Sequence, residues 1–340
     1  MATYKEIFGK QIKFLSSDPA NEGEGQIWYN STTGTFKSVV TTEAWRSAPA
    51  MITPRGVTGA GGGTGTSAIV SGTTGANPPG GLLAESYNGL GWSNETALPT
   101  SLGYATGTGS DSEEYVQLGG GYPSRTGTAL DYDGSSWTSA TAIPGGSPGY
   151  IEGGACGPAA TALFAGGNNG ETTTWERAGG SWTAGGANPQ GVYAQTMVGT
   201  PTAALSMGGL TYPGGYRDYN SSYNGTGWTT ETVLPATRGY AGGAGIQTAS
   251  IIFGGKSPGP AAVATCVKWD GTSWTATPNL GTARQSMASI GKTVGTAVAI
   301  PGIVAPAATE EFNQSANVIT AGAWASGGAM GTARYQIGGC

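Results

Sequence analysis

Seven tryptophans recur along this chain at intervals of 45 to 50 residues, and this spacing constrains the fold more than any other feature. They are Trp45, Trp92, Trp137, Trp182, Trp228, Trp274 and Trp324. An aromatic residue stands five positions before four of them, at Tyr87, Tyr132, Tyr223 and Trp269. Glycine pairs mark the same point in successive intervals, at Gly119-Gly120, Gly166-Gly167, Gly208-Gly209 and Gly254-Gly255. A fixed period with a fixed internal order indicates stacked copies of one supersecondary unit.

The stretch from Thr237 to Trp274 shows what one unit contains. It has a small glycine-rich segment, an apolar segment, a β-branched and aromatic segment, and a last segment that begins with the tryptophan. The dipeptide Asp270-Gly271 predicts a tight turn between the last two. That turn would bring Trp269 and Trp274 together across neighbouring strands, where aromatic pairs stabilise a sheet. We therefore expect a four-stranded antiparallel meander in each unit and almost no helix.

Four strands in a period of the mid-forties are typical of a β-propeller blade. The order of glycine pair, aromatic residue and tryptophan resembles kelch repeats, from about Thr53 to Cys340. The resemblance implies an all-β, kelch-like β-propeller. It implies little about activity, because one fold supports many functions.

The two chain ends allow two blade numbers. The last residues repeat the GTAR of Gly281–Arg284, which opens the sixth unit. Since an open edge strand favours aggregation, we expect a composite closing blade from residues 25–45 and 325–340, and thus seven blades in a propeller of residues 25–340. Its strands would be Ala333–Gly338, Ile27–Asn30, Phe36–Val40 and Thr42–Trp45, after a leader or docking segment of residues 1–24. The alternative is six blades with the first 50 residues as a separate docking arm.

Charge and composition exclude several classes of protein. The net charge is −5 and no cluster of Lys and Arg exists, which argues against nucleic-acid binding. The sequence contains no run of about 20 apolar residues that would predict a membrane span. The N-terminus lacks the apolar core of a signal peptide. Cys156, Cys266 and Cys340 are odd in number and far apart, so we expect reduced thiols in a bacterial cytoplasm; the role of Cys340 stays open.

Catalytic and metal-binding chemistry has little support. The chain has no histidine, which removes the commonest general base and metal ligand. Glu113-Glu114 and Glu310-Glu311 would point to opposite faces of a strand, so we interpret them as solvated edge charges. We predict a non-enzymatic protein with no cofactor and no metal, and keep a glycan-degrading enzyme as a third hypothesis.

One loop is a candidate binding site. The segment after Gly208-Gly209 carries Tyr212, Tyr216, Arg217, Asp218 and Tyr219. Exposed tyrosines stack on sugars or anchor protein partners, and the charged residues beside them can supply hydrogen bonds. The alternative is structural: Tyr223 would be the core aromatic of the repeat, and the other tyrosines would cover a blade edge.

The N-terminal phrase LSSDPANEGEGQIWYNSTTGTFKSVV, followed by degenerate kelch-like units, resembles virion proteins of marine tailed phages. The residues that carry the resemblance are Ser16 to Asn21, Gly25, Gln26, Trp28, Tyr29, Asn30 and Lys37. It implies a structural protein of the particle, a capsid decoration or a tail- or fibre-associated propeller, which is assembled in the host cytoplasm and docks on other virion proteins. A homo-oligomer is left open. The alternative function is host attachment, as an adhesin for a cell-surface glycan.

Overall fold

The computed structural model describes residues 13–19, 27–56, 61–73, 80–121, 125–145, 151–168, 170–259, 261–302 and 308–321. In these ranges the chain consists of β-strands and turns, with three single-turn 3-10 helices, η1 (Gly80–Leu82), η2 (Ala159–Thr161) and η3 (Val294–Thr296). The prediction of an all-β chain is therefore confirmed for the part of the chain that the structure describes.

The chain divides into two compact units. Unit 1 comprises residues 1–42 and 315–340, and unit 2 comprises residues 43–314. This division differs from the predicted one, which placed the boundary after residue 24. Both terminal segments belong to unit 1, so unit 2 is formed by one uninterrupted stretch of chain.

Five four-stranded antiparallel sheets make up most of unit 2, each from one continuous stretch. Their strands are β4 (Gly61–Thr64), β5 (Ser67–Ser71), β6 (Ala84–Tyr87), β7 (Trp92–Asn94); β8 (Thr106–Gly109), β9 (Tyr115–Leu118), β10 (Ala129–Tyr132), β11 (Trp137–Ala140); β12 (Gly154–Cys156), β13 (Leu163–Ala165), β14 (Thr174–Ala178), β15 (Ser181–Ala184); β16 (Thr196–Thr200), β17 (Ala203–Met207), β20 (Asn220–Tyr223), β21 (Trp228–Thr230); and β22 (Gly242–Ile246), β23 (Ala249–Phe253), β24 (Cys266–Trp269), β25 (Trp274–Thr277). A separate hairpin, β18 (Leu210–Thr211) and β19 (Gly215–Tyr216), lies in the connection from β17 to β20.

The aromatic hairpin is confirmed in the four units whose sequence has an aromatic residue five positions before the tryptophan. Trp269 stands opposite Trp274 in the register of β24 and β25, and their ring centroids are 5.1 Å apart. The pairs Tyr87–Trp92, Tyr132–Trp137 and Tyr223–Trp228 repeat this arrangement at 4.8 to 5.0 Å. In the turn, the Asp270 carboxylate accepts the backbone N–H groups of Thr272 and Ser273, which explains why the turn begins with Asp or Asn.

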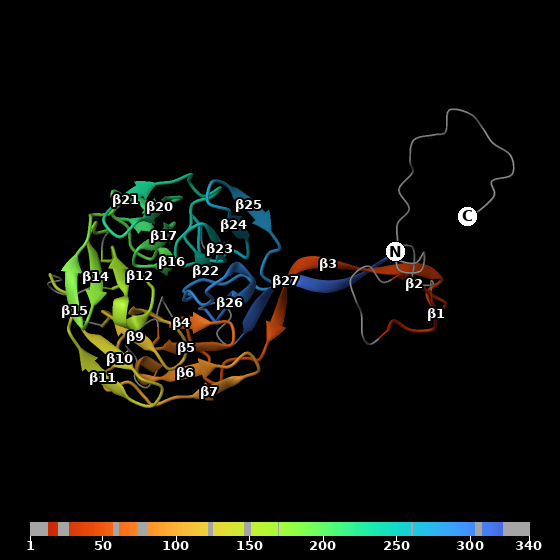
Figure 1. The fold of residues 1–340 in the computed structure, drawn as a ribbon, viewed down its shortest axis with the longest axis horizontal. Coiled ribbons are helices and arrows are strands. Elements are labelled where there is room, and N and C mark those ends of the chain that lie inside the picture. The colour runs from red at the N-terminus through yellow and green to blue at the C-terminus, as the bar shows by residue number, and fades with distance from the viewer. Residues whose placement is uncertain are drawn as a thin grey trace, which may run out of the picture. The chain divides into compact units, whose positions relative to one another are not determined.

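The sheets of unit 2 lie around a common centre, with the first strand of each sheet innermost and the last at the rim (Figure 1). Successive first strands are neighbours, from β4 to β8, β12, β16 and β22, and β22 adjoins η3. The glycine pairs follow the second strand of their sheets, and all of them have positive φ, as in Gly254 (φ 60°) and Gly255 (φ 94°). A side chain is strained in this conformation, so the repeat requires glycine there.

The last sheet combines strands from opposite parts of the sequence. Its strand order is β1-β2-β3-β27-β26, with β1 (Lys13–Leu15), β2 (Ile27–Asn30), β3 (Thr35–Ala48), β26 (Val298–Ala299) and β27 (Thr309–Ala321). The predicted break between Phe36–Val40 and Thr42–Trp45 is wrong, because both lie in the single strand β3. The proposed inner strand Ala333–Gly338 and Trp324 lie outside the described residues, so the composite seventh blade stays a prediction.

Within unit 2, the end of β3 completes the sheet of β26 and β27. Trp45 packs against Phe253 and Phe312, with ring centroids at 4.9 and 5.1 Å. Arg46 pairs with Glu311 at 2.6 Å. Trp45 thus joins β27 to the fifth sheet.

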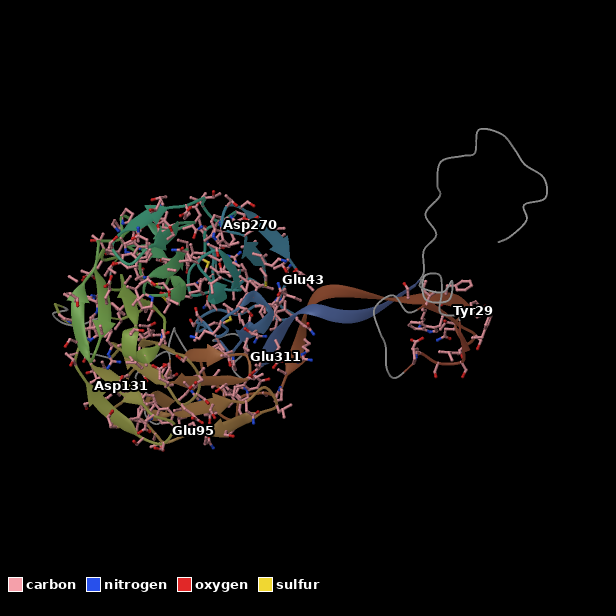
Figure 2. The ribbon with its side chains drawn as sticks, viewed as in Figure 1. Tyr29, Glu43, Glu95, Asp131, Asp270 and Glu311 are labelled. Atoms are coloured by element: carbon pink, nitrogen blue, oxygen red, sulfur yellow. The ribbon has the colours of Figure 1, made fainter. Side chains whose placement is uncertain are left out.

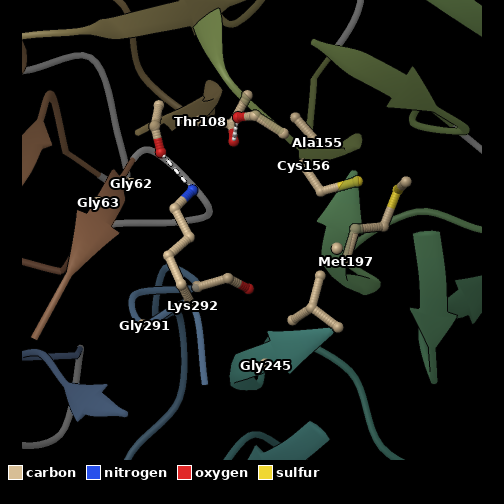
Figure 3. A pocket seen from close by; sticks show the side chains of 14 residues that line it. Gly62, Gly63, Thr108, Ala155, Cys156, Met197, Gly245, Gly291 and Lys292 are labelled. Atoms are coloured by element: carbon tan, nitrogen blue, oxygen red, sulfur yellow. Dashed lines mark hydrogen bonds between the residues drawn. The ribbon is translucent and has the colours of Figure 1, made fainter. Parts of the chain in front are cut away.

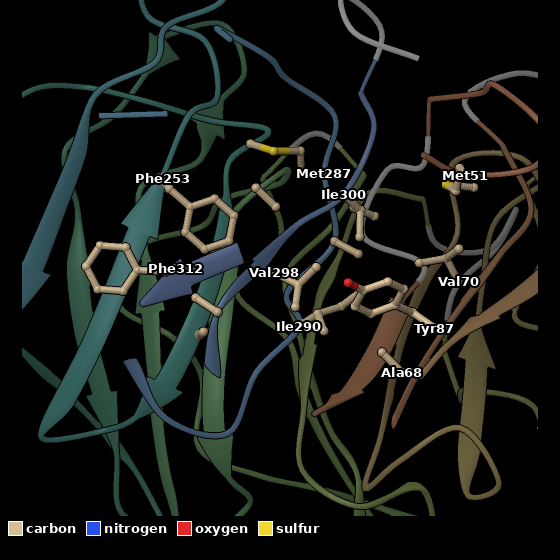
Figure 4. Close-up of a cluster of buried hydrophobic side chains, with 14 of the residues drawn as sticks. Met51, Ala68, Val70, Tyr87, Phe253, Met287, Ile290, Val298, Ile300 and Phe312 are labelled. Carbon is tan, nitrogen blue, oxygen red and sulfur yellow. The ribbon is translucent and has the colours of Figure 1, made fainter. Parts of the chain in front are cut away.

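The largest apolar cluster joins the first, fifth and last sheets (Figure 4). It includes Val70 and Tyr87 from the first sheet, Phe253 from the fifth, and Val298 and Phe312 from the last. Full burial of a side chain of this size contributes about 1.5–3 kcal/mol. Cys156 and Cys266 are buried and free, as expected; Cys340 lies outside the described residues.

Two buried ion pairs lie in the first and last parts of unit 2. Arg55 pairs with Glu85, and Arg284 pairs with Glu310, each with side chains at most 7% exposed. The Glu310 carboxylate also accepts the backbone N–H of Gly281 at 2.7 Å. The interpretation of Glu310 as a solvated edge charge is therefore wrong. Its neighbour Glu311, which is labelled in Figure 2, has a different partner and accepts a hydrogen bond from the Tyr87 hydroxyl at 2.6 Å, as expected for adjacent residues of a strand.

Unit 1 is organised around Asp18. Its carboxylate accepts hydrogen bonds from Trp28 Nε1 at 3.1 Å, Asn30 Nδ2 at 2.8 Å and Lys37 Nζ at 2.8 Å. The charge-assisted contact with Lys37, followed by the other hydrogen bonds, lowers the pKa of Asp18. β1 runs parallel to β2, which pairs antiparallel with the first part of β3.

Candidate functional site

The described residues of unit 2 contain no cluster that could hold a metal ion by His, Cys, Asp and Glu ligands. Burial raises the pKa of the Cys156 thiol to about 12, so this thiol stays protonated at neutral pH and is a poor nucleophile. The candidate sites considered below are binding surfaces.

The predicted tyrosine loop is the β18–β19 hairpin, and it is fastened to its neighbours. Leu210 stands opposite Tyr216 in this hairpin, and on its other side Leu210 exchanges two backbone hydrogen bonds with Tyr193, at 2.8 and 3.0 Å. Tyr212 at the tip is 71% exposed, whereas Tyr216 is half-buried. Tyr223 is fully buried, as the structural interpretation expected.

The other three predicted residues lie at the base of the hairpin. Arg217 donates from Nε to Thr211 Oγ1 at 2.8 Å, and its guanidinium lies 5.8 Å from the centroid of the Tyr219 ring. The backbone carbonyl of Asp218 accepts the N–H of Leu234 at 2.8 Å. Arg217 and Tyr219 are thus in contact with each other. Ligand binding by the five predicted residues stays a prediction.

A belt of left-handed residues surrounds the axis on the side of this hairpin. Tyr104, Glu152, Ala194, Tyr240 and Ser286 all have φ between 53° and 61° and stand at the same point of successive units, before the inner strand. Each residue after the first donates its N–H to the carbonyl of the one before it, at 2.7 to 2.9 Å. Side chains with Cβ atoms adopt this conformation at a cost, so the belt positions are set by inter-sheet hydrogen bonding rather than by local preference.

Glu152 is the one carboxylate in the described part of this belt, and tyrosines surround it. Its carboxylate accepts a hydrogen bond from the Tyr240 hydroxyl at 3.3 Å. Burial raises the pKa of Glu152 to about 7, against the opposing effects of the Tyr240 hydrogen bond and the positive charge of Arg125. Burial first, and then repulsion from the charge of Glu152, also raise the pKa of Tyr240. We call Glu152, Tyr193, Tyr216 and Tyr240 the tyrosine cluster.

Residues of the predicted loop interact electrostatically with the other residues of this cluster. Burial raises the pKa of Tyr193, with contributions from Glu152 and Tyr212, and burial raises the pKa of Tyr216, with contributions from Tyr193 and Glu152. The hydroxyls of these tyrosines therefore stay protonated at neutral pH and can donate hydrogen bonds. The cluster combines aromatic surface, donors and one acidic group.

Sequence reasoning found Tyr212 and Tyr216 but missed Glu152, Tyr193 and Tyr240. A signal was present for Glu152, because a carboxylate occupies a repeat position where other units have Tyr104, Ala194 or Tyr240. The proximity of the loop before β12 to the loop before β22 follows only from the ring arrangement.

The opposite end of the axis contains a narrow cavity between the inner strands (Figure 3). It encloses about 30 Å³, which suits a water molecule rather than a substrate. Lys292 reaches into it and donates to the carbonyl of Gly109 at 2.6 Å, and burial lowers the pKa of this amine. Because this cavity is too small for a substrate, the tyrosine cluster is the better candidate site.

Sheets ranged around a common axis define an all-β, propeller-like protein. Its fold is similar to a solved structure, that of YjhT, with a TM-score of 0.63 over 80% of this chain and 99% of YjhT at 13% sequence identity. At that identity the likeness shows the fold alone. No protein-family model matches the chain, and no curated protein matches its sequence. None of the described helices has the length and apolar character needed to cross a membrane.

Proposed function

We propose that this chain is a non-enzymatic structural protein of a phage particle, either a capsid decoration or a tail- or fibre-associated propeller. In this proposal, unit 1 attaches the protein to other virion proteins. One observation carries the proposal: both terminal segments of the chain belong to unit 1, whereas unit 2 is a single insertion between them. This division leaves unit 1 available as the docking part and unit 2 as the body of the protein.

The contacts inside unit 1 support this proposal. The residues that carry the resemblance to phage virion proteins include Asp18, Trp28, Asn30 and Lys37, which form one hydrogen-bonded cluster. The motif therefore builds the small unit itself. We propose that the task of this small unit is attachment to the particle.

Unit 1 also presents an aromatic row. Phe14, Tyr29 and Phe36 are cross-strand neighbours, with ring centroids 5.2 Å apart in both steps. Phe14 is 75% exposed and Phe36 is 38% exposed. Exposed aromatic side chains gathered on a small unit are typical of protein interfaces, where such residues contribute most of the binding energy.

The test is incorporation into particles. The chain is produced in infected bacteria with Phe14→Ser and Phe36→Ser, and its copy number in purified particles is measured by quantitative mass spectrometry. We expect many copies of the original chain and a loss of about tenfold or more for the variant, because interface aromatics commonly contribute above 2 kcal/mol each.

The matched control is Leu90→Ser, which removes an apolar side chain that is 85% exposed on unit 2. It should be incorporated at the original level. Absence of the original chain from particles contradicts the virion proposal, and full incorporation of the Phe14/Phe36 variant contradicts the docking role of unit 1.

A second candidate function is host attachment through a cell-surface glycan. The exposure of Tyr212, at 71%, and its position beside the tyrosine cluster favour it. A glycan array measures this function directly, with a Tyr212/Tyr216/Tyr219 triple alanine variant as comparison. Equal binding by the variant, or no binding by the original chain, would count against it.

For the blade number we propose the six-blade alternative, with unit 1 as the docking part. Three contacts between the last and first sheets support it. The Gly291 N–H donates to the Gly63 carbonyl at 3.1 Å, the Tyr87 hydroxyl donates to Glu311 at 2.6 Å, and Trp92 Nε1 donates to Thr309 Oγ1 at 3.2 Å. Elsewhere the hydroxyls of Tyr132 and Tyr223 reach Glu95 and Glu176 of the preceding sheet in the same way. A seventh blade would have to separate these partners.

A further inference from the structure

A small cavity lies within the belt at the hairpin side of the axis. It is lined by Glu152, Gly153, Ala194, Gln195, Tyr240, Ala241 and Met287, and it encloses about 20 Å³. A space of this size holds one water-sized chemical group. Its polar lining is confined to three side chains, those of Glu152, Gln195 and Tyr240.

The side chain of Gln195 is fixed in place, and its amide oxygen accepts no hydrogen bond from the described residues. The residue is 7% exposed, and its Nε2 donates to the Ala165 carbonyl at 2.7 Å, which fixes the amide. Its Oε1 is buried and has no hydrogen-bond partner among the described residues. A buried amide oxygen without a donor destabilises the fold, so this oxygen is available to a donor other than the described residues, such as a water molecule or a ligand.

Glu152 is the second acceptor. Its one hydrogen bond from a described side chain is the long one from Tyr240, at 3.3 Å. A carboxylate has about four lone-pair sites, and one contact leaves most of its capacity unused. Glu152 forms no ion pair within 4.0 Å in the described part of the chain, although the charge of Arg125 acts on it.

One wall of the cavity is aromatic, that of Tyr240, and Gly153, Ala194, Ala241 and Met287 form the rest of the lining. Tyr240 lines the cavity, and the hydroxyls of Tyr193 and Tyr216 are close enough to Glu152 for its charge to act on them. Aromatic faces attract cations, and a carboxylate beside them strengthens the attraction. A neutral hydroxyl has a single donor and no charge, so it would leave either Glu152 or Gln195 Oε1 without an adequate partner.

We propose that this cavity binds a primary ammonium group, with the Glu152 carboxylate and Gln195 Oε1 as its acceptors. An ammonium group is water-sized and has three donors, enough to serve both acceptors. The group can belong to a lysine side chain of a partner protein or to an amino sugar. This inference is independent of the docking role of unit 1.

The proposal predicts a pH dependence with a definite sign. Glu152 has a pKa of about 7 in the free protein, so below pH 7 it is mostly protonated and must lose a proton to pair with the cation. The tyrosines near it, Tyr193, Tyr216 and Tyr240, have raised pKa values and do not titrate in this range. Affinity should therefore rise about tenfold per pH unit below 7 and become constant above it.

Isothermal titration calorimetry on the full chain tests this with n-butylammonium as the probe and n-butanol as its neutral counterpart. We expect binding of butylammonium alone, with the pH dependence above. Glu152→Gln should weaken binding at least about tenfold at pH 8 and remove the pH dependence. Glu113→Gln, at an exposed glutamate, should change neither.

Two further probes at pH 7 distinguish the sources of the ammonium group. They are Nα-acetyl-lysine methylamide, and methyl glucosaminide paired with its N-acetyl derivative. Preference for the lysine derivative supports a protein partner, and preference for the amino sugar over its N-acetyl form supports a glycan. No binding of butylammonium at millimolar concentration, equal binding of butanol, or an affinity independent of pH in the original chain would overturn the proposal, even where Glu152→Gln fails to fold.

Discussion

The sheet β22–β25 is built from residues 242–277, one continuous stretch, whereas the sheet of β26 and β27 takes its outer strand from residues 43–48 of β3. In the first case a four-residue turn at Asp270 keeps β25 beside β24. In the second case no turn joins β3 to β27, so the strand is held by its backbone hydrogen bonds to β27 and by side-chain contacts. The comparison shows where the arrangement of sheets around an axis depends on non-covalent contacts instead of chain connectivity.

Those contacts are concentrated on three residues of β3. Trp45 packs on Phe253 and Phe312, and Arg46 pairs with Glu311. Glu43 pairs with Lys268 and accepts a hydrogen bond from Thr277 Oγ1 at 2.9 Å. Glu43 and Trp45 therefore link the outer strand to the fifth sheet as well as to its own.

The largest expected effect comes from removing the outer strand of the last sheet. A chain that begins at residue 49 loses Glu43, Trp45 and Arg46 and leaves β27 with an open edge, so we expect aggregation or a large loss of thermal stability. A chain that begins at residue 43 keeps these contacts and should fold. Circular dichroism melting and size-exclusion chromatography compare the two; similar stability of both chains would show that β3 is dispensable for unit 2.

The second prediction compares two buried arginines at equivalent positions. Arg284→Ala leaves the Glu310 carboxylate buried without its cation, and loss of one partner of a buried pair costs about 3–5 kcal/mol. Arg238 instead donates to the Thr265 carbonyl and hydroxyl, both at 3.0 Å, so Arg238→Ala leaves no buried charge and should cost about 2 kcal/mol. Urea unfolding of both variants measures the difference, and an equal cost would mean that the ion pair contributes nothing beyond hydrogen bonding.

A smaller effect is expected at the junction of the two sheets. Glu43 and Lys268 are both about a quarter exposed, and solvent screens such pairs. Glu43→Gln should therefore destabilise unit 2 by about 0.5–1 kcal/mol at low salt and by less in 1 M NaCl. A cost that is independent of salt would assign the effect to the Thr277 hydrogen bond.

The smallest expected effect is that of removing residues 322–340. If six sheets close the ring, the melting temperature of unit 2 should stay unchanged, because the closing contacts involve Gly63, Tyr87 and Glu311. If these residues supply the inner strand of a seventh blade, the truncated chain should be strongly destabilised. The melting curve thus decides between the two blade numbers.

Much of the fold could be predicted from the sequence, for local reasons. The Asp270-Gly271 turn and the Trp269–Trp274 pair depend on residues within one hairpin, and the glycine pairs depend on their own φ angles. The single strand β3 could not be predicted, because a strand that passes from one unit to the other has no local signal at its midpoint. Glu310 was misjudged because its cation, Arg284, is 26 residues away in sequence.

The candidate site was predictable only in part. Tyr212 and Tyr216 were visible as an irregular tyrosine-rich loop. Glu152 and Tyr240 are 88 residues apart and meet because each precedes an inner strand at the same axis. The unused oxygen of Gln195 depends on a hydrogen bond to Ala165 that no sequence pattern indicates.

The sequence by itself determined the repeated four-stranded unit, its aromatic hairpin and the scarcity of catalytic groups, because these depend on residue types and on contacts between near neighbours in the chain. Only the tertiary structure decided which strand completes the last sheet and which side chains surround Glu152. Both depend on segments that the chain brings together only when the sheets pack around an axis, and the free energy of that packing comes from contacts that no single repeat contains.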